Sequence, residues 1–149
     1  MLQVCVFLVG AYLCGLFLNA SLILMVLMTW PVTAIPYWFR LILAVAPLYF
    51  LLVGLFLRKD RRDLTPRRAL AAAGVLGGVL LVPAAVLAAV MPDSVLGWFL
   101  FPVSGDIAAA LGQVEVWSPL YSLLGAAGAP LLFWIGTRLA PMFYPEKKK

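Results

Sequence analysis

The chain has 149 residues, of which 65% are hydrophobic and 11% are charged, and its formal net charge at pH 7 is +5. Soluble domains carry about 25% charged residues, so a water-facing surface is excluded for most of this chain and a membrane protein is expected. There is no histidine, which argues against a His-ligated haem or metal and against a Ser–His or Cys–His catalytic set. The two cysteines, Cys5 and Cys14, have neither the number nor the spacing of a zinc site or a CxxC redox pair.

Residues 2–28 contain no charged side chain and predict the first transmembrane helix. At a rise of about 1.5 Å per residue, such a helix is about 40 Å long, which exceeds the ~30 Å hydrocarbon core and implies a tilt or a projecting end. No Lys or Arg precedes the apolar run, and the run is longer than the core of a signal peptide. We therefore expect an uncleaved transmembrane helix.

Three further transmembrane helices are predicted after a break at Pro31 and Pro36, where tryptophan and tyrosine side chains mark the membrane boundary. They cover about residues 37–57, 69–90 and 117–139. Thr65 and Pro66 predict the start of the third helix, with Thr65 as its N-cap and Pro66 at its first position. The sequence thus predicts one all-α transmembrane domain of four helices over residues 1–149.

Positive charge is concentrated in the loop between the second and third predicted helices. The chain has 11 Lys and Arg and 6 Asp and Glu, and eight of these 17 charged residues lie between Arg58 and Arg68. The basic residues of this loop are Arg58, Lys59, Arg61, Arg62, Arg67 and Arg68. Such a cluster beside a membrane attracts anionic lipid head groups by about 1 kcal/mol per residue, so we expect it to contact lipid.

The distribution of charge also predicts the orientation of the chain. The basic loop has six basic and two acidic residues, and the segment 138–149 has four basic residues and one acidic residue. Because cytoplasmic loops carry the excess of Lys and Arg, we expect both regions in the cytoplasm. With four spans, both termini are then cytoplasmic, and a plasma membrane is the expected location.

The segment between the third and fourth predicted helices is too apolar for a free loop and too interrupted for a span. We expect a short interfacial or re-entrant helical segment at about residues 94–112, here called the outer segment. Asp93, Asp106 and Glu115 lie in or beside it. Arg40 begins the second helix on the same side of the membrane, where an unpaired guanidinium is costly. We predict that Arg40 contacts one of these carboxylates, Asp106 foremost, a carbonyl of the outer segment or a lipid phosphate.

Small side chains recur at helical spacing in three of the four predicted helices. Helices in lipid associate where small residues allow their backbones to approach closely. The candidate packing residues are Ala11, Gly15, Asn19, Gly74, Gly78, Ser122, Gly125 and Ala129. We expect them to pack helices within one chain or between chains.

No P-loop, dinucleotide-binding or GxSxG pattern is present. We therefore expect a non-catalytic small subunit of a membrane-embedded complex, acting as a scaffold, anchor or accessory chain without a cofactor. Its partners are expected to be membrane lipids and either other membrane subunits or further copies of itself, and no nucleic acid. The alternative is a small oligomeric carrier or lipid-handling protein with a site near Arg40 and the outer segment.

Overall fold

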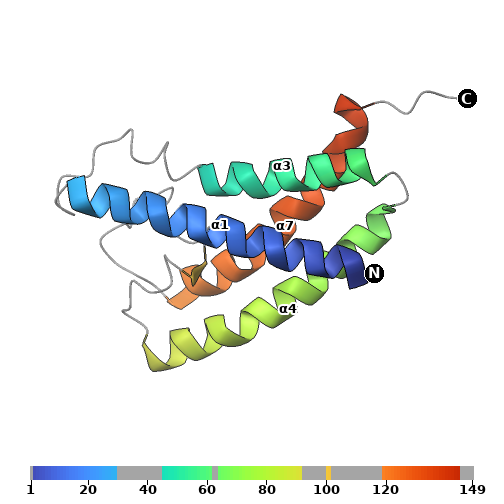
Figure 1. Ribbon diagram of the computed structural model, residues 1–149. Helices are drawn as coiled ribbons and strands as arrows, with labels where there is room; N and C mark the ends of the chain where they lie inside the picture. Colours follow the sequence, from blue (N-terminus) through green and yellow to red (C-terminus); the bar gives the residue numbers. More distant parts are fainter. Residues whose placement is uncertain (1, 30–44, 62–63, 92–99, 102–118, 145–149) are drawn as a thin grey trace, which may run out of the picture.

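The computed structural model describes residues 2–29, 45–61, 64–91, 100–101 and 119–144, and in these ranges it contains helices and no strand (Figure 1). The all-helical class is therefore confirmed for the described part of the chain. The four helices are α1 (Leu2–Thr29), α3 (Val45–Asp60), α4 (Pro66–Val90) and α7 (Pro119–Phe143).

Three of these helices are long and apolar enough to cross a membrane. The qualifying stretches are Leu2–Met25 in α1, Pro66–Val90 in α4 and Ser122–Phe143 in α7. The described part of α3 has 16 residues, which gives a length of about 24 Å. The rest of the second predicted span, residues 37–44, lies outside the described residues.

The start of the second predicted span lies outside the described residues, and the other helix ends agree with the predicted spans to within one turn, except at the end of α7. That helix continues past residue 139 to Phe143 and includes Pro141 in its final turn. Residues 140–143 are apolar, so the helix continues past Arg138 by one further apolar turn.

The start of α4 is as the sequence predicts. The Oγ1 atom of Thr65 accepts a hydrogen bond from the backbone N–H of Arg68 at 3.3 Å, and Pro66 occupies the first helical position. The side chain thus satisfies one of the backbone donors that a helix start leaves unpaired, and proline there removes another. This local chemistry defines where α4 begins.

Successive described helices run in opposite directions, so that four helix ends meet at one end of the bundle. Nη1 of Arg61, after α3, donates to Oε1 of Gln3 at the start of α1 over 3.0 Å. Nζ of Lys59 lies 4.7 Å from the ring centroid of Tyr144, just beyond α7. The N-terminal end of α1 and the C-terminal ends of α3 and α7 therefore lie together (Figure 1).

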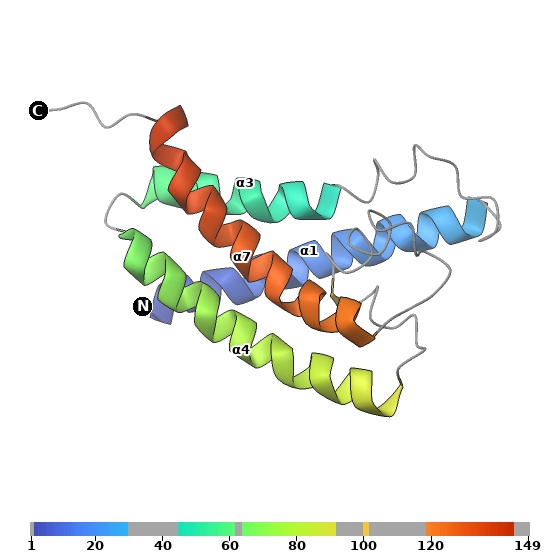
Figure 2. The same ribbon diagram turned by 180° about the vertical axis from the view of Figure 1, so that it is seen from behind.

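The helix α7 lies between α3 and α4 and packs extensively on both (Figure 2). The helix α1 passes behind α7 in this view and packs less extensively on α3 and α4. The core of the bundle includes the rings of Phe50 in α3 and Phe133 in α7, which are 3% and 1% exposed. Small side chains such as Ala129 surround them. The central position of α7 explains why 44% of its span is buried, against 17% for α4.

Candidate functional site

The residues predicted for the ligand or pinning contact, Arg40, Asp93, Asp106 and Glu115, lie outside the described residues, as does most of the outer segment. Two described residues of that segment show how it meets the bundle. The carbonyl oxygen of Leu100 accepts a hydrogen bond from the Tyr12 hydroxyl at 2.7 Å. Phe101 is 1% exposed and packs with Ala84 and Ala126. The outer segment is therefore fixed to the bundle at this point by α1, α4 and α7.

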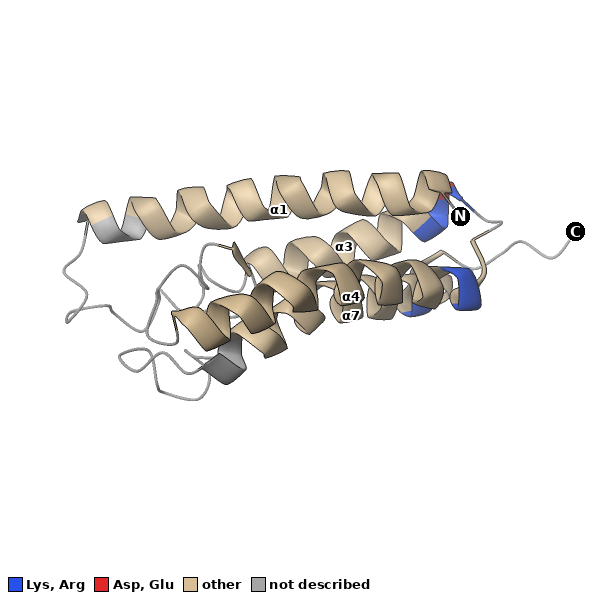
Figure 3. Cartoon of the chain, turned by 90° about the horizontal axis from the view of Figure 1, so that it is seen from below, with Lys and Arg blue, Asp and Glu red and all other residues tan. Residues whose placement is uncertain are grey.

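All the basic residues that the structure describes lie at one end of the bundle, here called the basic end (Figure 3). They are Arg58, Lys59, Arg61, Arg67, Arg68 and Arg138. Arg62, the remaining residue predicted to contact lipid, is not among the described residues. The basic end thus presents a band of positive charge next to three apolar helices.

Two aromatic rings and the side-chain amide of Gln3 position several of these cations. The guanidinium of Arg138 lies 5.3 Å from the Trp134 ring centroid, and the ammonium of Lys59 lies over Tyr144. Such contacts hold the charged group near the membrane boundary while its aliphatic stem packs on apolar surface. The charges therefore have defined positions on the ends of α3 and α7.

The small-residue face predicted on α1 packs against α3 within the chain. A Cβ atom added to Gly15 would clash with the ring of Phe50 and would lie 3.0 Å from Cε1 of Tyr49. The Tyr49 hydroxyl donates to the carbonyl oxygen of Ala11 over 3.1 Å. Asn19, on the same face, is 2% exposed. Gly15 thus provides the space that two aromatic rings of α3 occupy.

The small-residue face predicted on α7 is also buried within the chain. Ser122 is fully buried and Ala129 is 1% exposed, and Gly125 is buried between them. Ala129 belongs to the central core together with Phe133. This face is therefore used to hold the bundle together.

The face predicted on α4 is different, because Gly74 and Gly78 point away from the rest of the described chain. A Cβ atom added to either glycine would have no heavy atom within 4 Å, whereas one added to Gly77 would lie 3.7 Å from Cγ of Pro130. Other exposed residues continue the same row along α4. Together this α4 outer row consists of Ala71, Gly74, Gly78, Val82, Ala85 and Ala89.

The helices α3 and α7 approach each other closely at Gly54 and Gly136, neither of which is among the packing residues predicted from the sequence. A Cβ atom at Gly54 would clash with the carbonyl oxygen of Phe133, and one at Gly136 would clash with that of Leu51. Each added Cβ would also lie 3.1 Å from the Cα atom of the other glycine. The sequence does indicate a candidate close contact at Gly54, because this glycine is the one small residue among the bulky side chains at positions 48–57.

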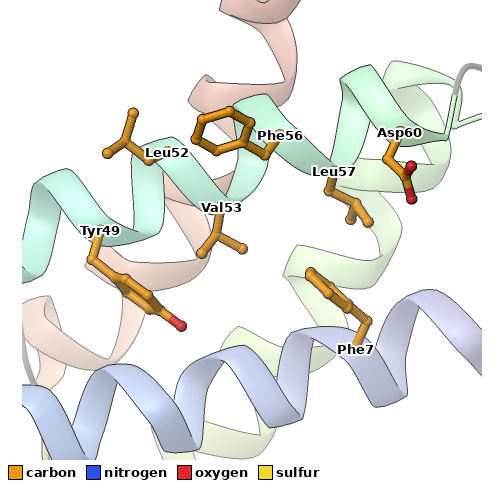
Figure 4. Close-up of a pocket in the computed structure, with 7 residues that line it drawn as sticks. All are labelled: Phe7, Tyr49, Leu52, Val53, Phe56, Leu57 and Asp60. Carbon is orange, nitrogen blue, oxygen red and sulfur yellow. The ribbon is translucent and has the colours of Figure 1, made fainter.

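An open groove lies between α1 and α3 and has a volume of about 420 Å³ (Figure 4). We call it the α1–α3 groove. Its lining residues are Phe7, Tyr49, Leu52, Val53, Phe56, Leu57 and Asp60. Asp60 is the charged member of this lining and lies at the basic end, so the groove is apolar along its length and polar at its mouth.

No group of three or more His, Cys, Asp or Glu side chains able to hold a metal ion occurs within the described ranges. Comparison of the chain with protein families, with curated proteins and with solved structures gives no match.

Proposed function

We propose that the protein is a non-catalytic small subunit of a membrane-embedded complex, a scaffold, anchor or accessory chain, and that the α4 outer row contacts a neighbouring transmembrane helix. The observation that carries this proposal is the outward position of Gly74 and Gly78, with no described atom near the place of a side chain. The neighbouring helix belongs either to another subunit or to a second copy of this chain.

Helix association in lipid is driven differently from association in water. An apolar surface gains little by leaving hydrocarbon for another apolar surface, so close backbone approach and van der Waals contact decide which faces associate. Each glycine in a helix interior costs about 1 kcal/mol relative to alanine. Gly74 and Gly78 give no packing in return within the described chain, and a close contact with another helix would offset that cost.

The orientation that we propose for the chain in the membrane is based on the positive charge of the basic end. We place α3 together with residues 37–44 as the fourth span and the basic end in the cytoplasm, because Lys and Arg accumulate on that side. Both termini are then cytoplasmic and the membrane is the plasma membrane. The contact between Arg61 and Gln3 supports this arrangement, because it joins the start of α1 to the basic loop.

The second candidate is a small oligomeric carrier or lipid-handling protein. The α1–α3 groove favours the lipid-handling form of this hypothesis over the transport of a polar solute, since its lining is apolar except for Asp60. A site near Arg40 and the outer segment stays part of this second hypothesis.

The proposed contact is tested by purifying the tagged full chain in a mild detergent and identifying what elutes with it. We expect the wild-type chain to elute as a stable assembly with another membrane protein or with itself. The double variant Gly74→Leu/Gly78→Leu is expected to weaken association about tenfold or more, because overpacking a close contact costs about 1–3 kcal/mol.

Gly10→Leu is the matched control, since Gly10 also lies on an exposed helix face with no atom within 4 Å of an added Cβ. It lies on α1, outside the α4 outer row, so this variant is expected to associate like the wild type. The proposal fails if the wild-type chain elutes as a monodisperse monomer without a partner. It also fails if Gly10→Leu weakens association as much as the double variant does.

A further inference from the structure

The α1–α3 groove has a length that matches one leaflet of a membrane. Its lining runs along α3 from Tyr49 to Asp60, which corresponds to about 16 Å of helix. Half of a ~30 Å hydrocarbon core is about 15 Å. The groove therefore extends from the basic end to about the middle of the bilayer.

The inner end of the groove is closed by Tyr49, whose side chain crosses from α3 towards α1 (Figure 4). Its hydroxyl donates to the carbonyl oxygen of Ala11, so the ring is held in this position. Beyond it, Gly15 brings the two helices into close contact. An acyl chain that enters at the basic end would thus end near the bilayer centre.

The outer end of the groove carries charged groups. The guanidinium of Arg61 is bound to Gln3, and Gln3 precedes the lining residue Phe7 by four positions, so both lie on the same face of α1. Arg61 therefore lies about one helical turn beyond the apolar lining, next to Asp60. A guanidinium provides five donors in a planar arrangement suited to phosphate, and one of its nitrogens bonds to Gln3.

The residue types of the groove distinguish a lipid from a helix as its occupant. Helices pack closely in membranes where small residues face each other, and the groove is lined instead by large side chains such as Phe7, Leu52 and Phe56. A flexible acyl chain can follow such an irregular surface, whereas a second helix would be held away from it. The α4 outer row consists mostly of small residues, which allow close packing of a second helix.

We propose that the α1–α3 groove binds one acyl chain of an anionic glycerophospholipid of the phosphatidylglycerol type, drawn from the leaflet at the basic end. In this site Arg61 contacts the lipid phosphate and Asp60 accepts hydrogen bonds from the head-group hydroxyls. The net positive charge of the basic end favours an anionic lipid over a zwitterionic one. The site is independent of the proposed association through α4.

The occupant is tested with phosphatidylglycerol that carries a photoactivatable group on one acyl chain, diluted into phosphatidylcholine vesicles containing the full chain. We expect the label on peptides of α1 and α3 that line the groove. Val53→Phe places a larger side chain in the groove and is expected to reduce this labelling severalfold. Leu131→Phe is the control, since Leu131 is exposed on α7 and outside the groove.

The head-group contact is tested with Arg61→Gln, which is expected to lower labelling by phosphatidylglycerol about tenfold, the equivalent of losing one hydrogen bond between charged groups. Arg67→Gln removes an equal charge from the start of α4 and is expected to leave groove labelling near the wild-type level. Gln3→Ala removes the contact between Gln3 and Arg61 but keeps the guanidinium, and is expected to retain labelling. Helix content and elution volume show whether each variant is folded.

The proposal is overturned if Arg61→Gln and Arg67→Gln lower labelling equally, because the effect is then general surface charge. Equal labelling by an analogous phosphatidylcholine probe would also overturn it, since the site then selects no head group. Crosslinks from groove positions to another protein chain would show that a helix fills the groove. These outcomes leave the α4 test unaffected, because that test measures association in detergent.

Discussion

Gly136→Ala is expected to lower the free energy of unfolding of the bundle by about 1–3 kcal/mol, the usual cost of overpacking a well-packed interior. The added methyl group would meet the carbonyl oxygen of Leu51. That atom belongs to the backbone of α3 and cannot rotate away as a flexible side chain can, so the two helices must separate. Gly54→Ala is expected to have a similar effect, because its methyl group would meet the carbonyl oxygen of Phe133.

The measurement is unfolding in mixed micelles with increasing SDS, followed by tryptophan fluorescence. Gly10→Ala serves as the control, because its methyl group meets no atom within 4 Å and alanine favours the helix by about 1 kcal/mol over glycine. We expect unchanged or slightly higher stability for this control. A Gly136→Ala variant as stable as the control would show that α3 and α7 do not cross as closely as described.

Phe101→Ala is expected to detach the outer segment from the bundle. Phe101 is buried between Ala84 of α4 and Ala126 of α7, and removing such a ring from a packed site costs about 3–5 kcal/mol. Backbone amides around Ala84 and Ala126 are then expected to exchange hydrogen faster, while those at the basic end keep their rates. Hydrogen exchange followed by mass spectrometry resolves the two ends.

Two further variants show whether the faster hydrogen exchange expected for Phe101→Ala is caused by loss of the buried ring. Phe101→Leu keeps an apolar side chain of moderate size and is expected to have a smaller effect. Tyr12→Phe removes only the hydrogen bond to the Leu100 carbonyl and is expected to cost about 1 kcal/mol. Equal exchange rates in Phe101→Ala and wild type would contradict the described packing of Phe101.

Several features of the fold follow directly from the sequence. Long apolar runs predict three helices that the structure shows to be long and apolar enough to span a membrane, and Thr65 with Pro66 predicts the start of α4. These predictions succeed because they depend on local properties, namely the solvent that a segment tolerates and the backbone groups that its end leaves unpaired.

The partners of the helix faces could not be predicted in the same way. Gly15 and Gly78 lie in rows of small residues that look alike in the sequence, yet Gly15 packs against rings of α3 and Gly78 faces outward. Helical periodicity identifies residues that share a face, but it carries no information on which surface covers that face. The pairing of Gly54 with Gly136 shows the same limit, because it is decided by the relative positions of two helices distant in the sequence.

The central claim, that the α4 outer row contacts another transmembrane helix, is tested most directly by cysteine crosslinking in intact membranes. In a chain whose Cys5 and Cys14 are replaced by alanine, single cysteines are introduced at Ala71, Gly78 and Ala85, and at Leu131 on α7 as a control. We predict crosslinks to a second protein chain from the three α4 positions and none from position 131. Crosslinking that is absent from the α4 positions, or equal at all four, would contradict the account.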